Sequence, residues 1–341
     1  MLSFSSDYIA GAHPDVLQKL IDTNLESLAG YGNDIYTQKA CEKIIKEIDK
    51  EDAQVYLLTG GTQTNQIVID TMLADYEGVL SATTGHVNVH EAGAIEFSGH
   101  KVLTLPTEDG KIKAQDIRDY IEIFYKDGSY DHMVFPGMVY ISYPTELGTL
   151  YTKNELEDIY GVCKDYEIPF FIDGARLAYG LMSPECDLNI KDLARLCDVF
   201  YIGGTKCGSL AGEAVVFTHN NQPKRFNTLV KQRGAMIAKG RLLGIEFDAL
   251  FTDNLYYEIG KTGIKQAEKL KEILEKKGYE FFMKTPTNQQ FIVIENSKME
   301  ELAKKVDFAF TQTLDANHTV IRFCTSWSTT DEDLKLLEEC L

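Results

Sequence analysis

The sequence predicts an α/β protein, with a large domain built on a mostly parallel sheet of seven strands covered by helices, and a small α+β domain after it. Short apolar runs alternate with longer segments of helical periodicity. The runs are almost continuously apolar, which is typical of parallel strands buried on both faces. A chain of 341 residues can build one large core and a smaller one, so we expect domains at 1–254 and 255–341.

The expected elements follow in order. The first thirty or so residues are expected to form an arm with one helix at 15–28. Strands are expected at 53–58, 79–82, 101–105, 138–142, 169–173, 198–202 and 213–217. Helices are expected between most of them, as at 65–76, 117–126 and 153–166. The periodic stretch 255–278 bridges to the small domain, whose expected segments are 289–295, 299–307, 319–324 and 331–340.

Charge and composition limit the partners. The net charge of -18 would repel nucleic acid and anionic membranes, so neither is expected as a partner. There is no apolar run long enough for a membrane span and no signal-peptide pattern, and the seven scattered cysteines lack zinc-finger spacing. A cytoplasmic location with reduced thiols is the expectation. One basic segment, 231–241, stands out, although a solvated helix face would also explain it.

A glycine turn follows the strand at 53–58. Gly60 and Gly61 precede a helix that opens with Thr62, Gln63 and Thr64. Glycines allow a close approach of the backbone, and the free N–H groups of a helix start attract a phosphate. A plain turn with Thr62 or Thr64 as the helix cap is the alternative.

Two further strand ends carry charged residues. The apolar strand at 169–173 ends in Asp173, and a carboxylate in that position needs a cationic or hydrogen-bonding partner. Arg176 could hold a second anion, or could form a structural ion pair with Asp173. Lys206 follows the next strand after two glycines, so in a parallel sheet it emerges at the same edge as Asp173. A desolvated lysine beside other cations titrates low and can form an imine.

A pair of histidines follows the strand at 79–82. His86 and His90 lie at helical spacing beside Glu91, but no third ligand accompanies them, so zinc is disfavoured and no metal is expected. A flat imidazole of His86 stacked on a pyridine ring fits better. "IGKTG" at 259–263 lacks the first glycine of a phosphate-binding loop, and no dinucleotide-binding glycine motif follows a strand. An amine, a carboxylate and an anion cradle are instead what pyridoxal 5'-phosphate requires.

Taken together, the motifs resemble the low-specificity L-threonine aldolases, which are pyridoxal-phosphate enzymes of fold type I, the aspartate-aminotransferase fold, in the beta-eliminating lyase/threonine aldolase group. The resemblance covers essentially the whole chain and includes "GYGNDIYT", "GGTQTN", "GHVNVHEAGA", "FIDGARLAYG" and "FYIGGTKCG". It implies cleavage of L-threonine or L-allo-threonine to glycine and an aldehyde.

The resemblance also implies roles for individual residues. Lys206 would form the Schiff base, Asp173 would hold the pyridinium nitrogen, and His86 would stack on the ring. Gly61, Thr62 and Thr205 would bind the phosphate, joined across a dimer interface by Tyr36 and Lys231. Arg176, Arg322 and Ser6 would hold the substrate carboxylate. A homodimer or homotetramer is therefore expected.

Two positions depart from the family pattern. Ser5 stands where many relatives carry an arginine, and Pro144 and Thr145 stand where many carry a histidine that reaches the β-hydroxyl. His86, His90, Glu91 or a positioned water stays open as the base. A β-eliminating lyase is the alternative within the fold, while a cofactor-binding protein without turnover and a non-enzymatic scaffold are alternatives from other classes.

Overall fold

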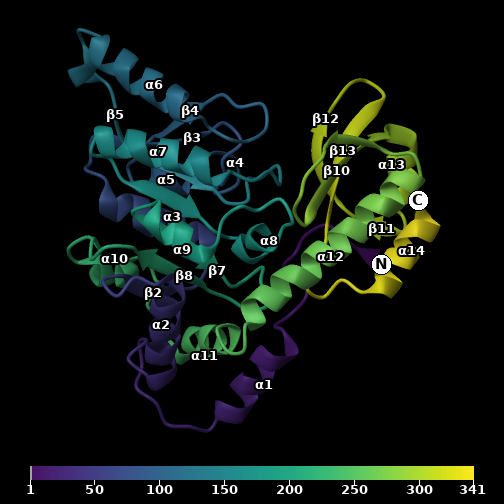
Figure 1. Cartoon of the computed structure of the whole chain (residues 1–341), viewed down its shortest axis with the longest axis horizontal. Coiled ribbons are helices and arrows are strands. Elements are labelled where there is room, and N and C mark those ends of the chain that lie inside the picture. Colours follow the sequence, from purple (N-terminus) through teal and green to yellow (C-terminus); the bar gives the residue numbers. More distant parts are fainter. Residues whose placement is uncertain (1) are drawn as a thin grey trace.

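The computed structural model describes residues 2–341 (Figure 1). A sheet of seven strands in the order β2-β8-β7-β6-β5-β3-β4 forms its centre. The strands are β2 (Gln54–Leu58), β3 (Glu77–Ala82), β4 (Val102–Leu105), β5 (Phe135–Ser142), β6 (Phe170–Asp173), β7 (Val199–Gly203) and β8 (Glu213–Phe217). All pairs from β7 to β4 are parallel, whereas β8 is antiparallel to both of its neighbours. The predicted fold class is confirmed.

Two apolar layers cover this sheet because successive strand residues point to opposite faces. Val139 and Ile141 of β5 belong to one buried cluster, while Met138 and Tyr140 belong to the other. The first face is covered by α2 (Ile35–Ile48), α6 (Ala114–Lys126), α7 (Lys153–Asp165), α8 (Leu177–Leu181), α9 (Ile190–Arg195), α11 (Arg241–Leu250) and α12 (Leu255–Lys276). The second is covered by α3 (Gly61–Met72), α4 (His86–Val89), α5 (Ala94–Phe97) and α10 (Phe226–Gln232).

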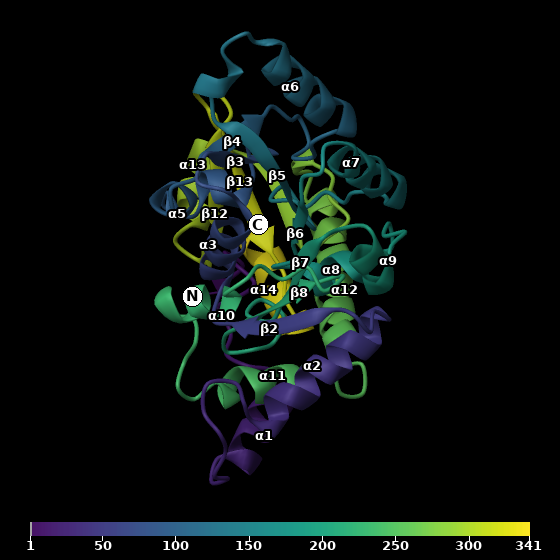
Figure 2. The ribbon, with the colours of Figure 1, turned by 90° about the vertical axis from the view of Figure 1, so that its left-hand side faces the viewer.

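Two expectations for the N-terminal segment were wrong. The first helix, α1 (Pro14–Thr23), ends well before residue 28, and Leu25 beyond it is 94% exposed, so no packing partner extends the helix. Helix α2 was not expected at all. Figure 2 shows α2 beside the edge strand β2, with α11 and then α1 beyond it, and contacts join these elements in that order.

The C-terminal part forms a second layer around an antiparallel sheet in the order β12-β13-β10-β9. Its elements are β9 (Glu280–Met283), β10 (Gln289–Glu295), α13 (Asn296–Leu302), β11 (Val306–Asp307), β12 (Ala309–Thr313), β13 (His318–Cys324) and α14 (Asp331–Cys340). Helix α12 runs between the two parts of the molecule (Figure 1). The start of the arm, β1 (Leu2–Ser3), pairs with β11, and Phe4 joins the small apolar cluster there.

A short 3₁₀ helix at Tyr130–His132 completes the elements named for the large part. Within residues 2–341, no helix combines the length and the apolar character needed to cross a bilayer.

Candidate active site

A cavity of about 390 Å³ lies where β6 and β7 end and α3 begins. Lys206, Asp173, His86 and Arg176 all line it, although they are far apart in the sequence. Because β6 and β7 are parallel neighbours, their carboxyl ends meet at one edge of the sheet. The expected meeting of Lys206 with Asp173 therefore follows from the sheet topology. Gly61, Thr62 and Thr205 line the same cavity.

Lys206 is carried by a tight turn at the end of β7. A Cβ on Gly203 would collide with the carbonyl oxygen of Ala175, so the glycine lets the turns after β6 and β7 pack directly together. The Lys206 side chain is partly buried, and its amino group has no hydrogen bond or ion pair within residues 2–341. Burial, and then the charge of Arg176, lower the pKa of this amine, which favours its nucleophilic form.

Asp173 is held ionised in the floor of the cavity. Its carboxylate accepts hydrogen bonds from Tyr140 at 2.6 Å, Asn65 at 2.9 Å and the Ala175 N–H at 3.0 Å. Burial would raise the pKa of Asp173, but the neighbouring His86 and these hydrogen bonds lower it overall. An ionised carboxylate in this setting is suited to hold a protonated pyridine nitrogen.

The glycine turn leaves its helix start uncapped. Gly60 is the N-cap of α3, and no side chain accepts a hydrogen bond there, so the interpretation of Thr62 or Thr64 as a cap was wrong. The first N–H groups of α3 are left for a ligand at the cavity wall. Thr205 lies on the other side of this turn, where its hydroxyl donates to Glu213 at 3.0 Å.

His86 is fixed by a buried acid. Its Nδ1 lies 2.8 Å from Oε1 of Glu91, which also accepts from Asn65 at 2.6 Å. The His90 ring is 5.8 Å from the His86 ring, centre to centre, and His90 ends the short helix α4. Burial raises the pKa of Glu91 and lowers the pKa of His90. His86 alone of these three lines the cavity.

Arg176 pairs with the arm and not with Asp173, so the alternative of a structural Asp173–Arg176 ion pair was wrong. Asp7 accepts from Nε and Nη2 of Arg176 at 2.7 and 3.1 Å, and from Asn288 at 2.9 Å. Burial opposes ionisation of Asp7, but the charge of Arg176 prevails and lowers its pKa to about 2. The guanidinium is thereby fixed at the cavity wall, with a carboxylate behind it.

The other two expected carboxylate ligands are Arg322 and Ser6. Arg322 donates to Gln289 at 2.9 Å and to the Ser5 carbonyl at 2.9 Å, while its Nε is buried without a partner. The hydroxyl of Ser6 lies 3.5 Å from Asp7. Neither side chain lines the cavity in this conformation, whereas Tyr8 of the same arm does.

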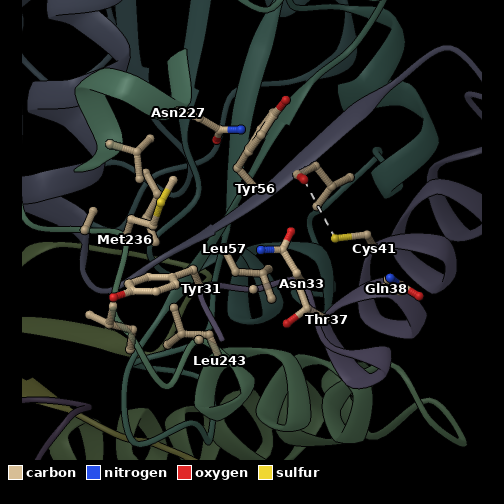
Figure 3. Close-up of a pocket in the computed structure, with 17 residues that line it drawn as sticks. Tyr31, Asn33, Thr37, Gln38, Cys41, Tyr56, Leu57, Asn227, Met236 and Leu243 are labelled. Atoms are coloured by element: carbon tan, nitrogen blue, oxygen red, sulfur yellow. Dashed lines mark hydrogen bonds between the residues drawn. The ribbon is translucent and has the colours of Figure 1, made fainter. Parts of the chain in front are cut away.

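Tyr36 and Lys231 lie away from this cavity. The Tyr36 hydroxyl donates to Glu26 at 2.9 Å, and the Lys231 amino group is 4.5 Å from the centre of the Tyr31 ring. Tyr31 lines a second cavity of about 420 Å³ along β2, together with Asn33 and Tyr56 (Figure 3). No charged side chain lines that second cavity, so it lacks the groups that imine chemistry needs.

Two acids of the main cavity were not singled out from the sequence. Glu146 follows β5 and accepts from the His86 N–H at 2.9 Å and from the Ser142 hydroxyl. Glu213 opens β8, and a Cβ on Gly61 would lie 4.0 Å from its Oε1. A carboxylate at the edge of an apolar run is the signal that could have identified Glu213; the local sequence around Glu146 gives no comparable signal.

These residues fit pyridoxal phosphate. They provide a desolvated amine without a partner, a buried ionised carboxylate, an uncapped helix start and a flat imidazole. Within residues 2–341 there is no group of three or more His, Cys, Asp or Glu side chains arranged for a metal ion.

Comparisons with known proteins identify the family and the fold. The family model described as beta-eliminating lyase matches residues 3–297. The low specificity L-threonine aldolase of Pseudomonas aeruginosa is 27% identical over 337 residues, covering 98% of this chain and 95% of that protein. The structure of Leishmania major threonine aldolase is 42% identical, with a TM-score of 0.95 over 100% of this chain and 98% of that one. Histidinol-phosphate aminotransferase of Clostridium acetobutylicum, at 15% identity and a TM-score of 0.75 over 100% and 98% of the two chains, shares the fold.

Proposed function

Because this chain belongs to the beta-eliminating lyase family, we propose that it is a pyridoxal-phosphate-dependent carbon–carbon lyase that cleaves L-threonine and L-allo-threonine to glycine and acetaldehyde. The observation that carries the proposal is the convergence of Lys206, Asp173 and the uncapped start of α3 on one cavity. The amine, the carboxylate and the phosphate cradle are the three groups that this cofactor demands of a protein.

Each residue has a defined task at the cofactor. Lys206 would hold the aldehyde carbon of the cofactor through its amino group. Asp173 would hold the protonated pyridine nitrogen, and the ring of His86 would pack against the pyridine. Thr62, Thr205 and the N–H groups around Gly61 would bind the phosphate. When bound, pyridoxal phosphate supplies an electron sink for the pair left on Cα after bond cleavage.

The substrate carboxylate is assigned to Arg176. Asp7 holds the guanidinium of Arg176 through two hydrogen bonds. The Arg176 side chain is therefore ordered before the substrate binds, and binding costs less conformational entropy. Arg322 and Ser6 are proposed to act together with it. With the amine at Lys206 and the carboxylate at Arg176, the orientation of the remaining bonds at Cα is fixed.

A homodimer or homotetramer in the cytoplasm is part of the proposal. Tyr36 and Lys231 do not line the cavity of their own chain, and Lys231 belongs to the basic segment of an acidic protein. Their proposed role is to reach the phosphate in the cavity of a second copy, where a cation offsets the phosphate charge.

The experiment measures glycine and acetaldehyde release from both threonine diastereomers, by the protein and by Lys206→Ala, with added pyridoxal phosphate. Release that depends on Lys206 supports the proposal. Release of pyruvate and ammonia from another amino acid, without acetaldehyde from threonine, would identify a β-eliminating lyase instead. Binding of the cofactor without turnover of any amino acid would indicate a cofactor-binding protein that has no catalytic activity.

A further inference from the structure

The cavity is also lined by one acid with a free oxygen. Glu146 lines the cavity beside His86, Ser142 and Pro144. Its Oε1 accepts from the His86 N–H at 2.9 Å and from the Ser142 hydroxyl. Its Oε2 has no hydrogen-bond partner within residues 2–341. The side chain is therefore held in place by one oxygen while the other is available to a ligand.

The proposed function leaves the part of the cavity beside Glu146 for Cβ. It assigns the substrate amine to Lys206 and the carboxylate to Arg176, and the cofactor would take the region of Asp173, Gly61 and His86. The lining residues that remain for the β-substituent include Tyr8, Ser142, Pro144 and Glu146. A hydroxyl on Cβ needs a proton acceptor there before the Cα–Cβ bond can break.

The other acids of the site already accept hydrogen bonds from neighbouring protein groups. Asp173 accepts three hydrogen bonds at the nitrogen end of the proposed cofactor position. Glu213 accepts from Gly204 and Thr205 on the phosphate side. Glu91 is engaged with Asn65 and His86, and its remaining oxygen is buried without a partner.

His90 does not line the cavity, and the Nδ1 of His86 is bonded to Glu91. Burial raises the pKa of Glu146 as well, so its carboxylate is a stronger base than an exposed one. Thr145, in the same loop, is buried and bonded to Thr149, so it cannot take this role.

We propose that Glu146 is the catalytic base that removes the proton from the substrate β-hydroxyl. This inference rests on the proposed function. Glu146 takes the hydroxyl proton, the C–O bond becomes the carbonyl of acetaldehyde, and the Cα–Cβ bond breaks with its electron pair left on Cα. One proton then returns to Cα to complete glycine, so the atoms and charges of threonine balance those of the two products.

The test compares two reactions at the same site in Glu146→Gln, with Glu157→Gln on the exposed surface of α7 as the matched control. Threonine cleavage needs the hydroxyl base, whereas exchange of a glycine α-proton with deuterated water does not. We expect cleavage to fall by about 100-fold or more while glycine exchange changes by less than about threefold. The dissociation constants for glycine and L-2-aminobutyrate, which lack the hydroxyl, should also stay unchanged.

Cleavage within about threefold of the unaltered protein overturns the inference, because a general base contributes far more than that. A loss of exchange as large as the loss of cleavage also overturns it, since Glu146 would then support the cofactor or the fold. If the unaltered protein exchanges the glycine α-proton and yet cleaves neither L-threonine nor L-allo-threonine, the proposed function is wrong. This result is obtained without any variant.

Discussion

Glu213→Gln is expected to stabilise the protein at alkaline pH and to leave its stability in acid nearly unchanged. The Glu213 side chain is 4% exposed, and its two oxygens accept from the Gly204 N–H and the Thr205 hydroxyl, both at 3.0 Å. Burial raises its pKa to about 8, against the opposing charge of Lys206. Glu213 interacts electrostatically with five titratable groups, which are Lys206, Asp173, Tyr201, Cys207 and Tyr256.

The sign follows from proton linkage. In the unfolded chain Glu213 ionises near the ordinary glutamate pKa of 4.5, whereas burial in the folded chain raises its pKa to about 8. Between these values the unfolded state loses its proton first, so the free energy of unfolding falls as pH rises. The loss is about 1.4 kcal/mol per pH unit, or at most about 5 kcal/mol over the whole window. A glutamine does not titrate, and it keeps the hydrogen-bonding geometry of a protonated carboxyl.

The assay is the midpoint of thermal unfolding without added cofactor, at about pH 5 and about pH 9. The midpoint of Glu213→Gln should exceed that of the unaltered protein by several degrees in alkali only, since roughly 2 °C corresponds to each kcal/mol. Glu157→Gln, on the exposed face of α7, should show no such change. An equal difference between Glu213→Gln and the unaltered protein at both pH values would refute the reasoning, because it would show that Glu213 does not titrate in this window.

Three further predictions concern the cofactor and the substrate. Asp173→Asn should lower the turnover of threonine by about 100-fold or more while Lys206 still binds the cofactor, measured by kinetics and by cofactor absorbance. Asp7→Asn leaves Arg176 without its buried partner, so the free energy of unfolding should fall by about 3 kcal/mol and the KM for threonine should rise, measured by denaturant unfolding and kinetics. Mixing unfolded Lys206→Ala and Lys231→Ala chains and refolding them together should restore activity above that of either parent, because a mixed dimer contains one site with both lysines. Activity no higher than the average of the parents would contradict a shared site.

The large sheet and the site at its edge could be predicted because both depend on local signals and one topological rule. Each of the seven apolar runs became a strand, and alternation with helices made the central strands parallel. The positions of Asp173 and Lys206 at neighbouring strand ends then brought them together. The families matched by the chain confirm the predicted resemblance as well.

The errors at the N-terminus have different causes. Helix α2 had the necessary signals, with Asp34 accepting from the N–H groups of Tyr36 and Thr37 at the helix start and with apolar residues recurring at helical spacing. The end of helix α1 could not be predicted in this way, because the apolar pattern continues past Thr23 to Leu25, which is exposed in the structure. A periodic pattern indicates which face would be buried, and it does not indicate whether another element is present to bury it.

Contacts between distant segments explain what the sequence left open at the site. Arg176 had Asp173 as a candidate partner three residues away, yet it pairs with Asp7, which lies 169 positions away in the sequence. Arm and turn are brought together only by the tertiary fold, and no local pattern in the sequence records that contact. Glu146 was hidden for the same reason, since the donor that fixes it is the N–H of His86 on another loop.

The charges around the cavity connect Glu213 to the proposed partner chain. Asp173, Glu146 and Glu213 line it, and Asp7 is bonded to Arg176, against the two cations Lys206 and Arg176. A bound phosphate would add negative charge beside Gly61, close to Glu213. A protonated Glu213 would not repel that phosphate, and a cation approaching from a second chain would attract it. The two effects oppose the same charge, so Glu213→Gln should reduce the loss of cofactor affinity that Lys231→Ala causes at alkaline pH.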